Sequence, residues 1–297
     1  MNIGEILIEA YGILKKVKIE SYLLDSQLLL SQVLKKDKLF IMINRDFNIT
    51  KQQENEFLKL IQIRKDKMPI KYILGECEFM GMNFIVKPGV LIPRPDTEIL
   101  VEEVIKYIKE KGYTYICDVC CGSGAIGIAI AEFNKSTKVV LYDISKEALD
   151  VSELNIKRFN LSARVNEELS DLLQVAISKN KKFEVIVSNP PYIKKSVIPT
   201  LMDDVKNYEP LIALNGGEDG LDFYRRIAEE SLHVLEKGGL LAFEIGYDQR
   251  KEVVNILLEA GYKIIECIKD LSGNDRVIKA TLVDKQATLV VEPITLE

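Results

Sequence analysis

The chain has few of the residues that several common chemistries need. Its 297 residues include one histidine, His233, which nearly excludes serine–histidine catalysis and histidine-based metal sites. Its five scattered cysteines are an odd number and fit reduced thiols better than a disulfide framework. No apolar run approaches the length of a membrane span, and the N-terminus lacks the basic and apolar segments of a signal peptide. We therefore expect a cytoplasmic protein that has no contact with a membrane.

The chain also lacks a basic excess. Lys and Arg number 40 and Asp and Glu number 45, which gives a formal net charge of −5. Because neutralising phosphates requires clustered Lys and Arg, we expect no stable binding to nucleic acid. Hydrophobic residues make up 47% and charged residues 29% of the sequence, which is typical of a soluble globular protein with one large domain or two smaller ones.

Cysteine-based metal or redox chemistry has one candidate motif, Cys117-Asp118-Val119-Cys120. If this segment is a strand, its ends lie about 10 Å apart at ~3.3 Å per residue, too far for a disulfide or a shared metal ion unless the backbone bends. We expect both thiols to have ordinary packing roles, and we predict no metal site.

The first 75 residues have the pattern of short amphipathic helices. Apolar residues recur at three- and four-residue spacing from Ile3 to Val17, and further helices are expected at about 23–33, at 38–43 and after Thr50, which has capping-box form with Gln53. We predict a helical bundle over residues 1–75, with no residue set of obvious chemistry and a role in recognising a protein substrate. Alternating apolar positions and a Pro-Gly break then predict a β-hairpin linker over residues 76–92.

Strand-like and helix-like runs alternate from about Glu98 onward, which predicts an α/β fold with a mostly parallel sheet and helices on both faces. The expected strands include residues 115–119, 138–142, 183–187, 239–245, 262–268 and 277–282. A helix is expected over residues 221–235. The predicted catalytic domain covers residues 93–284, and a tail without a clear partner covers residues 285–297.

The tetrapeptide Asn189-Pro190-Pro191-Tyr192 follows the apolar run 183–188, at the strand end where open α/β sheets bind their ligands. The Asn189 side-chain carbonyl and a backbone carbonyl beside a proline can accept both N–H bonds of a planar –NH2 group. The two prolines restrict the backbone, and Tyr192 offers a flat face for stacking. The pattern indicates a methyl-transfer site for an amide or a base.

A glycine-rich turn after the strand 115–119 indicates the cofactor half of this site, because glycine lets a ligand approach the backbone closely. The residues predicted to bind the cofactor in this turn are Asp118, Cys120, Cys121, Gly122, Ser123 and Gly124. Nineteen residues after Gly124, Asp143 ends a strand and can accept hydrogen bonds from a ribose diol. This pair fits a dinucleotide or S-adenosylmethionine. Cys120 at the place of the first glycine weakens the dinucleotide interpretation.

A third segment, Ser170-Asp171-Leu172, follows another strand. Asp171 is predicted to reach an adenine amino group and Leu172 to cover the ring. A helix-capping role for Ser170 and Asp171 fits the spacing equally well.

The combination resembles the PrmC/HemK family of peptide chain release factor N5-glutamine methyltransferases. The resemblance covers nearly the whole chain, and its most specific part is the run from Leu91 to Glu98, Leu-Ile-Pro-Arg-Pro-Asp-Thr-Glu, together with Tyr72-Ile73-Leu74-Gly75. It implies a Rossmann-like class I methyltransferase sheet of seven strands whose last strand is antiparallel. It also implies methyl transfer from S-adenosyl-L-methionine, with S-adenosyl-L-homocysteine as product, to the glutamine side-chain amide nitrogen in the Gly-Gly-Gln motif of class 1 release factors.

By position, the resemblance implies that Asn189 to Tyr192 form the glutamine site, that Asn189 also borders the cofactor, and that Arg94 contacts the substrate. We expect a monomer. Two residues depart from the family pattern: Cys120 replaces a common glycine, and Leu172 stands where an aromatic residue is frequent.

Two alternatives remain open on the residues alone. An adenine-N6 DNA or RNA methyltransferase would present the same N–H geometry from a flipped base, although the acidic charge and the lack of a basic target-reading domain count against it. A non-catalytic adaptor would keep the fold without the chemistry, and the intact tetrapeptide and Asp143 count against that. No strong base is evident near Asn189, so positioning is the expected source of the rate, worth on the order of 7–11 kcal/mol.

Overall fold

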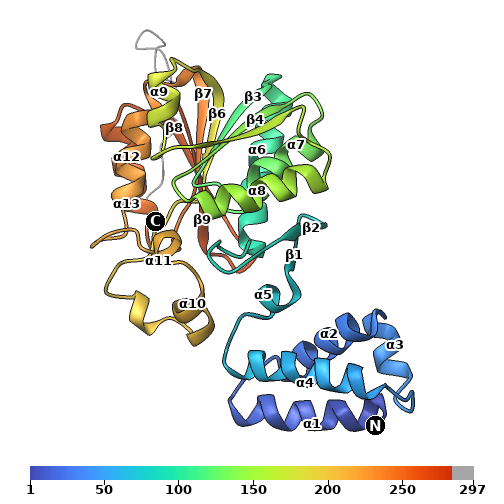
Figure 1. Cartoon of the computed structure of the whole chain (residues 1–297). Helices are drawn as coiled ribbons and strands as arrows, with labels where there is room; N and C mark the ends of the chain where they lie inside the picture. Colours follow the sequence, from blue (N-terminus) through green and yellow to red (C-terminus); the bar gives the residue numbers. More distant parts are fainter. Residues whose placement is uncertain (283–297) are drawn as a thin grey trace.

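The chain folds into an N-terminal helical bundle, a hairpin linker and a larger αβ domain (Figure 1). The computed structural model describes residues 1–282. The predicted tail, residues 285–297, and the last two residues of the predicted catalytic domain lie outside the described residues.

The bundle consists of four helices whose apolar stripes meet in one aliphatic core. They are α1 (Ile3–Lys16), α2 (Tyr22–Leu34), α3 (Lys38–Ile43) and α4 (Lys51–Lys65). The capping box at the start of α4 is confirmed, since Thr50 and Gln53 each accept the other's backbone N–H. A buried ion pair between Arg64 and Asp25, 2.7 Å apart, joins α4 to α2. A short helix that the sequence did not predict, α5 (Ile70–Leu74), follows the bundle.

The linker contains the predicted hairpin, in which β1 (Glu76–Phe79) pairs antiparallel with β2 (Met82–Ile85). Its two-residue turn, Met80-Gly81, has positive φ at both residues, 54° and 71°, as a type I′ turn requires. The Asn155 side chain bonds to both the N–H and the carbonyl of Ile85, at 2.7 and 3.0 Å. The hairpin is therefore anchored to the αβ domain.

The αβ domain is built on a seven-stranded sheet in the order β5-β4-β3-β6-β7-β9-β8. The strands are β3 (Tyr115–Val119), β4 (Lys138–Asp143), β5 (Val165–Leu169), β6 (Phe183–Ser188), β7 (Leu235–Glu244), β8 (Lys263–Lys269) and β9 (Asp275–Thr281). The pairs among β3 to β7 are parallel, whereas β9 runs antiparallel to both of its neighbours. The predicted α/β fold with an antiparallel last strand is confirmed.

The start of β7 and the end of the helix before it differ from the prediction by four residues each, because of one β-bulge. β7 begins at Leu235 because that residue pairs with Phe183, after which the register shifts before Leu240 pairs with Val185. Gly238 has a φ of +76° in this bulge. The preceding helix, α12 (Asp222–Ser231), consequently ends earlier than residue 235.

Helices cover both faces of the sheet (Figure 1). One core packs α6 (Glu98–Lys111), α7 (Ala125–Phe133) and α8 (Lys146–Arg158) on one face. A second core packs α9 (Gln174–Ser178), α12 and α13 (Arg250–Glu259) on the other. Both cores leave the carboxyl ends of β3, β4 and β6 at a common edge, where the site lies.

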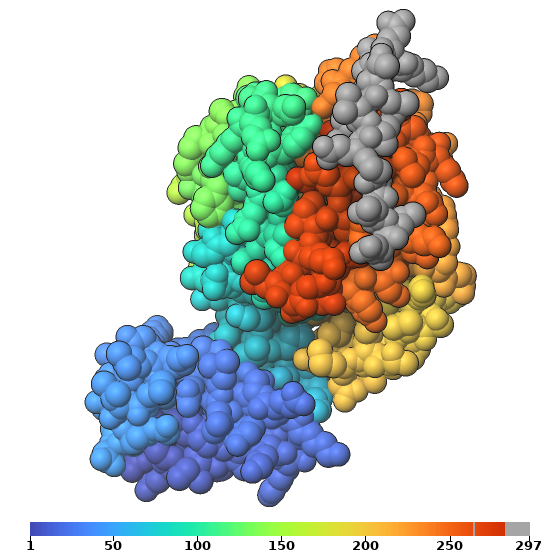
Figure 2. Space-filling view, turned by 180° about the vertical axis from the view of Figure 1, so that it is seen from behind, coloured from blue at the N-terminus to red at the C-terminus, as the bar shows by residue number. Residues whose placement is uncertain are grey.

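An irregular segment from residue 193 to residue 221 lies beside this edge, between the αβ domain and the bundle. It contains η2 (Ile198–Thr200), α10 (Asp203–Tyr208) and α11 (Leu211–Leu214), none of which the sequence predicted. The Tyr208 hydroxyl donates to the backbone carbonyl of Asp66 in the bundle. Figure 2 shows the bundle projecting from the αβ domain, next to the linker and this segment.

Candidate active site

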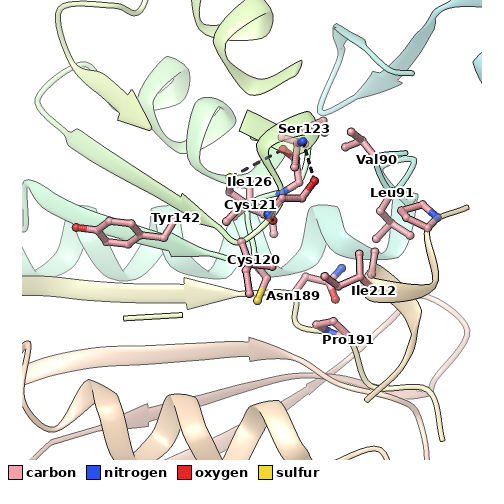
Figure 3. A pocket seen from close by; sticks show the side chains of 18 of the residues that line it. Val90, Leu91, Cys120, Cys121, Ser123, Ile126, Tyr142, Asn189, Pro191 and Ile212 are labelled. Carbon is pink, nitrogen blue, oxygen red and sulfur yellow. Dashed lines mark hydrogen bonds between the residues drawn. The ribbon is translucent and has the colours of Figure 1, made fainter. Parts of the chain in front are cut away.

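A cavity of about 240 Å³ opens at the carboxyl ends of the parallel strands. Its wall comes from the linker, the turn after β3, the end of β4, residues 170–172, the end of β6, α11 and α12. Figure 3 shows the Cys120 turn facing Val90 and Leu91 of the linker, with Asn189, Pro191 and Ile212 along the adjoining side. Segments far apart in the sequence thus meet at one apolar cavity with a few polar groups, as is usual for ligand sites.

Most of the residues predicted from the sequence reach this cavity, and four do not. Those that line it are Arg94, Cys120, Cys121, Gly122, Ser123, Asp143, Asp171, Leu172, Asn189 and Pro191. Those that are not part of its wall are Asp118, Gly124, Pro190 and Tyr192.

The turn after β3 is held in a left-handed conformation at three residues, Cys120, Gly122 and Gly124, with φ of 60°, 55° and 78°. Glycine adopts this conformation without strain, whereas a residue with a Cβ is strained by about 1–2 kcal/mol. At Gly124 a Cβ would also lie 2.9 Å from the Ile128 side chain. The Cys120 position therefore favours glycine for a backbone reason, and the cysteine adds local strain beside the cavity.

Asp143 ties this turn to the end of β4. Its Oδ2 accepts the N–H of Gly122 and its Oδ1 accepts the N–H of Ser145, both at 2.9 Å. Burial raises the pKa of Asp143, and these backbone N–H groups partly offset that rise. A carboxylate has about four acceptor positions, so Asp143 keeps capacity for hydroxyl donors from the cavity.

Asp118 acts behind the turn instead of lining the cavity. It is fully buried, and its Oδ2 accepts the N–H of Gly127 at 2.8 Å. Its Oδ1 has no partner among the described residues. Burial raises the pKa of Asp118 to about 8, while the Gly127 bond lowers it and the nearby charge of Asp143 raises it. Asp118 thus fixes α7 against β3, and a direct contact with a ligand does not follow from its position.

Residues 170–172 follow β5 and form another part of the wall. Asp171 pairs with Arg226 of α12 at 2.9 Å, and Leu172 is buried with a φ of +48°. The Ser170 hydroxyl accepts the N–H of Val175 at 3.2 Å, within the first turn of α9. The Ser170 hydroxyl thus satisfies one N–H at the start of α9, whose N-cap is Leu173, and Asp171 lines the cavity.

The tetrapeptide at the end of β6 presents two free acceptors. The Asn189 side-chain nitrogen donates to the Thr97 hydroxyl at 3.4 Å, and no hydrogen bond within residues 1–282 uses the side-chain carbonyl. No hydrogen bond between the described residues uses the Pro190 carbonyl. Two carbonyls at adjacent residues can accept both N–H bonds of a planar –NH2 group.

Tyr192 faces away from the cavity wall. Its hydroxyl donates to Glu244 at 3.3 Å, and its backbone carbonyl accepts from Gln249 at 3.0 Å. Burial and the neighbouring Glu244 carboxylate raise the pKa of Tyr192. Its ring packs against the core of the second sheet face, so a stacking face toward the cavity is not evident.

A glycine-containing strip packs directly on the tetrapeptide. This strip consists of residues 214–216, which bond to Ile193. The Ile193 N–H donates to the Leu214 carbonyl at 3.0 Å, and the Gly216 N–H donates to the Ile193 carbonyl at 2.9 Å. A Cβ at Gly216 would lie 2.7 Å from Tyr192 Cα and 2.8 Å from the Pro191 carbonyl oxygen. Since both obstacles are backbone, residue 216 must be glycine for the two segments to meet.

Arg94 lines the cavity and pairs with Glu209 at 2.5 Å. Burial raises the pKa of Glu209, and the Arg94 charge opposes this. The pair joins the linker to the residue just before Pro210, which also lines the cavity. Arg94 therefore holds the irregular segment in place, and its predicted contact with substrate stays a prediction.

Sequence reasoning missed part of the site. Thr97, Glu244 and Gln249 form hydrogen bonds behind the tetrapeptide, and Val90, Pro210 and Ile212 supply apolar wall. The one available signal for Thr97 was its place in the run from Leu91 to Glu98.

Comparisons with known proteins agree with this geometry. A family model described as "PrmC N-terminal domain" matches residues 5–75, and one described as "Methyltransferase small domain" matches residues 94–204. A release factor glutamine methyltransferase of Clostridium botulinum is 57% identical over 280 residues, which are 94% of this chain and 99% of that protein. One from Clostridium acetobutylicum is 53% identical over 280 residues, 94% of this chain and 98% of that protein. A solved methyltransferase structure from Pyrococcus furiosus shares the fold at 17% identity, with a TM-score of 0.50 over 79% of this chain and 100% of that one.

Proposed function

Because the chain belongs to the release factor glutamine methyltransferase family, we propose that it methylates the glutamine side-chain amide nitrogen, N5, in the Gly-Gly-Gln motif of class 1 release factors. The methyl donor in this proposal is S-adenosyl-L-methionine. The observation that carries it is that Asn189, whose side-chain carbonyl has no hydrogen-bond partner within residues 1–282, lines the same cavity as the glycine-rich turn and Asp143. The enzyme is a methyltransferase by family, and its precise substrate is the part that needs a test.

The cavity wall fits S-adenosylmethionine by its chemistry. A Cβ at Gly122 would have one neighbour within 4 Å, Val90 at 3.9 Å, so the missing side chain leaves space beside the turn. Asp143 has acceptor capacity for a ribose diol, Asp171 for an adenine amino group, and Leu172 offers an apolar surface for a ring. When bound, the cofactor supplies an activated methyl group.

The protein's own contribution is to hold and orient the glutamine amide. The Asn189 side-chain carbonyl and the Pro190 carbonyl accept its two N–H bonds, which directs the nitrogen into the cavity. An amide nitrogen is a poor nucleophile, and these carbonyls stabilise the positive charge that grows on it during reaction. Positioning of this kind supplies on the order of 7–11 kcal/mol, so the mechanism requires no strong base.

The bundle is the proposed site of release factor recognition. Its residues 1–75 contain 13 Lys and Arg and 9 Asp and Glu, although the whole chain is acidic. Exposed apolar side chains gather on and just after α3, at Leu39, Met42, Ile43 and Phe47. A basic surface with exposed apolar groups suits a protein partner. In this proposal the enzyme acts as a monomer in the cytoplasm.

No helix within residues 1–282 is long and apolar enough to span a bilayer.

Mass spectrometry tests the function directly. Purified protein is incubated with isotope-labelled S-adenosylmethionine and, separately, with a class 1 release factor, with duplex DNA and with no substrate. We expect one added methyl group, located on the glutamine of the Gly-Gly-Gln motif. Label in the DNA would support the adenine alternative, and cofactor binding without transfer to any substrate would contradict the proposal.

A further inference from the structure

Three buried or half-buried polar side chains are linked by hydrogen bonds behind the amide cradle, which consists of the Asn189 side-chain carbonyl and the Pro190 carbonyl. The Asn189 side-chain nitrogen donates to Thr97 Oγ1 at 3.4 Å, and the Thr97 hydroxyl donates to Glu244 Oε2 at 2.5 Å. Thr97 is 4% exposed and Glu244 is 1% exposed. The three residues come from different parts of the chain: Thr97 ends η1 (Pro95–Thr97), Asn189 follows β6 and Glu244 ends β7.

The hydrogens that these three side chains carry determine which of them donates and which accepts in each hydrogen bond. A threonine hydroxyl has one hydrogen and two lone pairs, and an ionised carboxylate can only accept. The hydrogen of Thr97 must therefore point to Glu244, which leaves a lone pair for Asn189. The Asn189 amide must then turn its –NH2 group to Thr97, so its carbonyl faces the other way, toward the substrate.

Glu244 is held as the fixed end of the chain by surrounding groups. Its Oε1 accepts from the Tyr192 hydroxyl at 3.3 Å, and its backbone carbonyl accepts from the Tyr224 hydroxyl at 3.0 Å. The charge of Arg276 lies close by, and this arginine pairs with Asp270 at 3.0 Å and with Asp96 at 3.3 Å. Burial raises the pKa of Glu244, whereas the hydrogen bonds from Thr97 and Tyr192 and the charge of Arg276 lower it and favour the ionised form, which only accepts hydrogen bonds.

We propose that Thr97 and Glu244 are positioning residues that set which end of the Asn189 amide faces the substrate. This rests on the proposed function, since the ligand is the glutamine side-chain amide. The arrangement makes the cradle selective for a group that donates hydrogen bonds, such as a primary amide. An Asn189 side chain turned the other way would present donors and would favour an ester or carboxylate of the same shape.

The direct test removes the Thr97 hydroxyl. Thr97→Val keeps the shape of the side chain, Thr97→Ser restores the hydroxyl, and Thr137→Val is the matched control. Thr137 is also fully buried, but its hydroxyl donates to the Asn134 carbonyl away from the cavity. If Thr97→Val does not fold, judged by binding of S-adenosylhomocysteine, Thr97→Ala replaces it.

Two readouts are compared for each variant. The first is the affinity, in the presence of S-adenosylhomocysteine, for a Gly-Gly-Gln peptide and for the same peptide with a glutamate methyl ester in place of the glutamine. The second is kcat and KM for methyl transfer. For the wild type we expect a preference for the amide of about tenfold or more, the equivalent of at least one hydrogen bond.

In Thr97→Val we expect the preference to fall to about threefold or less and kcat to fall about tenfold, with the KM for S-adenosylmethionine unchanged. Thr97→Ser recovers most of both losses, and Thr137→Val behaves as the wild type. A Thr97→Val protein that keeps both its preference and its kcat overturns the proposal, as does a wild type that binds the two peptides equally. A wild type that prefers the amide but transfers no methyl group contradicts the proposed function and leaves the role of Thr97 intact.

Discussion

The bundle and the αβ domain handle buried polar groups differently. In the bundle every buried polar or charged side chain has a partner, including Arg64 with Asp25 and Glu54 with Lys51. All four buried side-chain atoms that lack a partner within residues 1–282 belong to the αβ domain: Asp118 Oδ1, Tyr142 Oη, Glu209 Oε2 and Asp275 Oδ1. Unsatisfied groups destabilise a fold and tend to persist where function needs them. The buried polar groups therefore distinguish the bundle, in which all are paired, from the αβ domain, which also contains the candidate site.

Left-handed residues other than glycine occur in both regions, but those that line the cavity belong to the αβ domain. The bundle's left-handed residues other than glycine are lysines, such as Lys35, which ends α2. In the αβ domain two such residues, Cys120 and Leu172, line the cavity. Left-handed conformations at residues with a Cβ are strained, and their place beside the cavity is consistent with a shape determined by a ligand.

The largest expected effect tests whether chemistry belongs to the αβ domain alone. Asn189→Ala removes one of the two acceptors for the substrate amide, and we expect kcat to fall about 10²- to 10³-fold, as for loss of one transition-state hydrogen bond. Cofactor affinity, measured by calorimetry, stays close to the wild type. The control is Asn55→Ala on the exposed surface of α4. Near-normal turnover of Asn189→Ala would refute the mechanism.

The next effect tests whether the bundle's stability depends on its paired charges. Arg64→Leu leaves Asp25 buried without its partner, and we expect a loss of about 3–5 kcal/mol in the unfolding free energy of the bundle, measured in urea. If the bundle recognises release factors, the same variant loses activity on the whole protein and keeps activity on a short Gly-Gly-Gln peptide.

The double variant Asp25→Leu with Arg64→Leu is its control. Removing both charges from an apolar core is near neutral or stabilising, so most of the stability should return. Equal destabilisation in the single and double variants would mean that packing, and not the unpaired charge, is responsible.

The buried carboxyl of Asp118 in the αβ domain predicts a pH dependence of stability. Burial raises the pKa of Asp118 to about 8 in the fold, whereas the unfolded group ionises near 3.9. Between these values the folded state binds one more proton than the unfolded state, so stability falls as pH rises, by about 1.4 kcal/mol per pH unit, and levels off above pH 8.

Asp118→Asn removes this titration while its side-chain carbonyl still accepts from Gly127. We expect the unfolding free energy of the wild type, relative to Asp118→Asn, to fall by about 3 kcal/mol between about pH 5.5 and about pH 7.5 in urea titrations. A constant difference across this range would show that Asp118 is ionised in the fold.

Glycine substitutions compare the two regions by the space around each glycine. Gly216→Ala forces the strip away from Pro191 and Tyr192, and a displacement of this kind lowers kcat by about 10²-fold. Gly12→Ala in α1 meets no atom within 4 Å and should stabilise the helix by up to about 1 kcal/mol with kcat unchanged. Equal kcat values for the two variants would remove the distinction between the regions.

Local patterns were sufficient to predict much of the fold. Period and turn chemistry located α3, the hairpin and the core strands, because each depends on residues close in sequence. The strand β5 lacks an apolar run because it lies at the edge of the sheet, so its residues Asn166, Glu167 and Glu168 are polar. α10 bonds to the bundle through Tyr208 and Asp66, and α11 accepts the N–H of Ile193 at Leu214; no local pattern predicts these contacts.

The site shows the same limit. Asp143 and Asn189 were predictable because the strand ends that precede them share one edge of the sheet. Asp118 lies behind the cavity wall, because alternation along β3 puts it on the face of α7, opposite to Cys117 and Val119. The contact between Thr97 and Glu244 spans 147 positions, so only the folded chain reveals it.

The place of β9 in the sheet also sets an order of assembly. β9 lies between β7 and β8, and β8 pairs with no other strand of the described sheet. During synthesis the bundle has its complete core once about residue 75 has emerged, and N-terminal units generally fold first. β8, by contrast, is made before the strand that attaches it, and β7 keeps an open edge until then. The αβ domain, which contains the cavity, therefore completes its sheet in one late step, when β9 pairs with β7 and β8. Before that step the open edge of β7 is most exposed to pairing with a wrong strand.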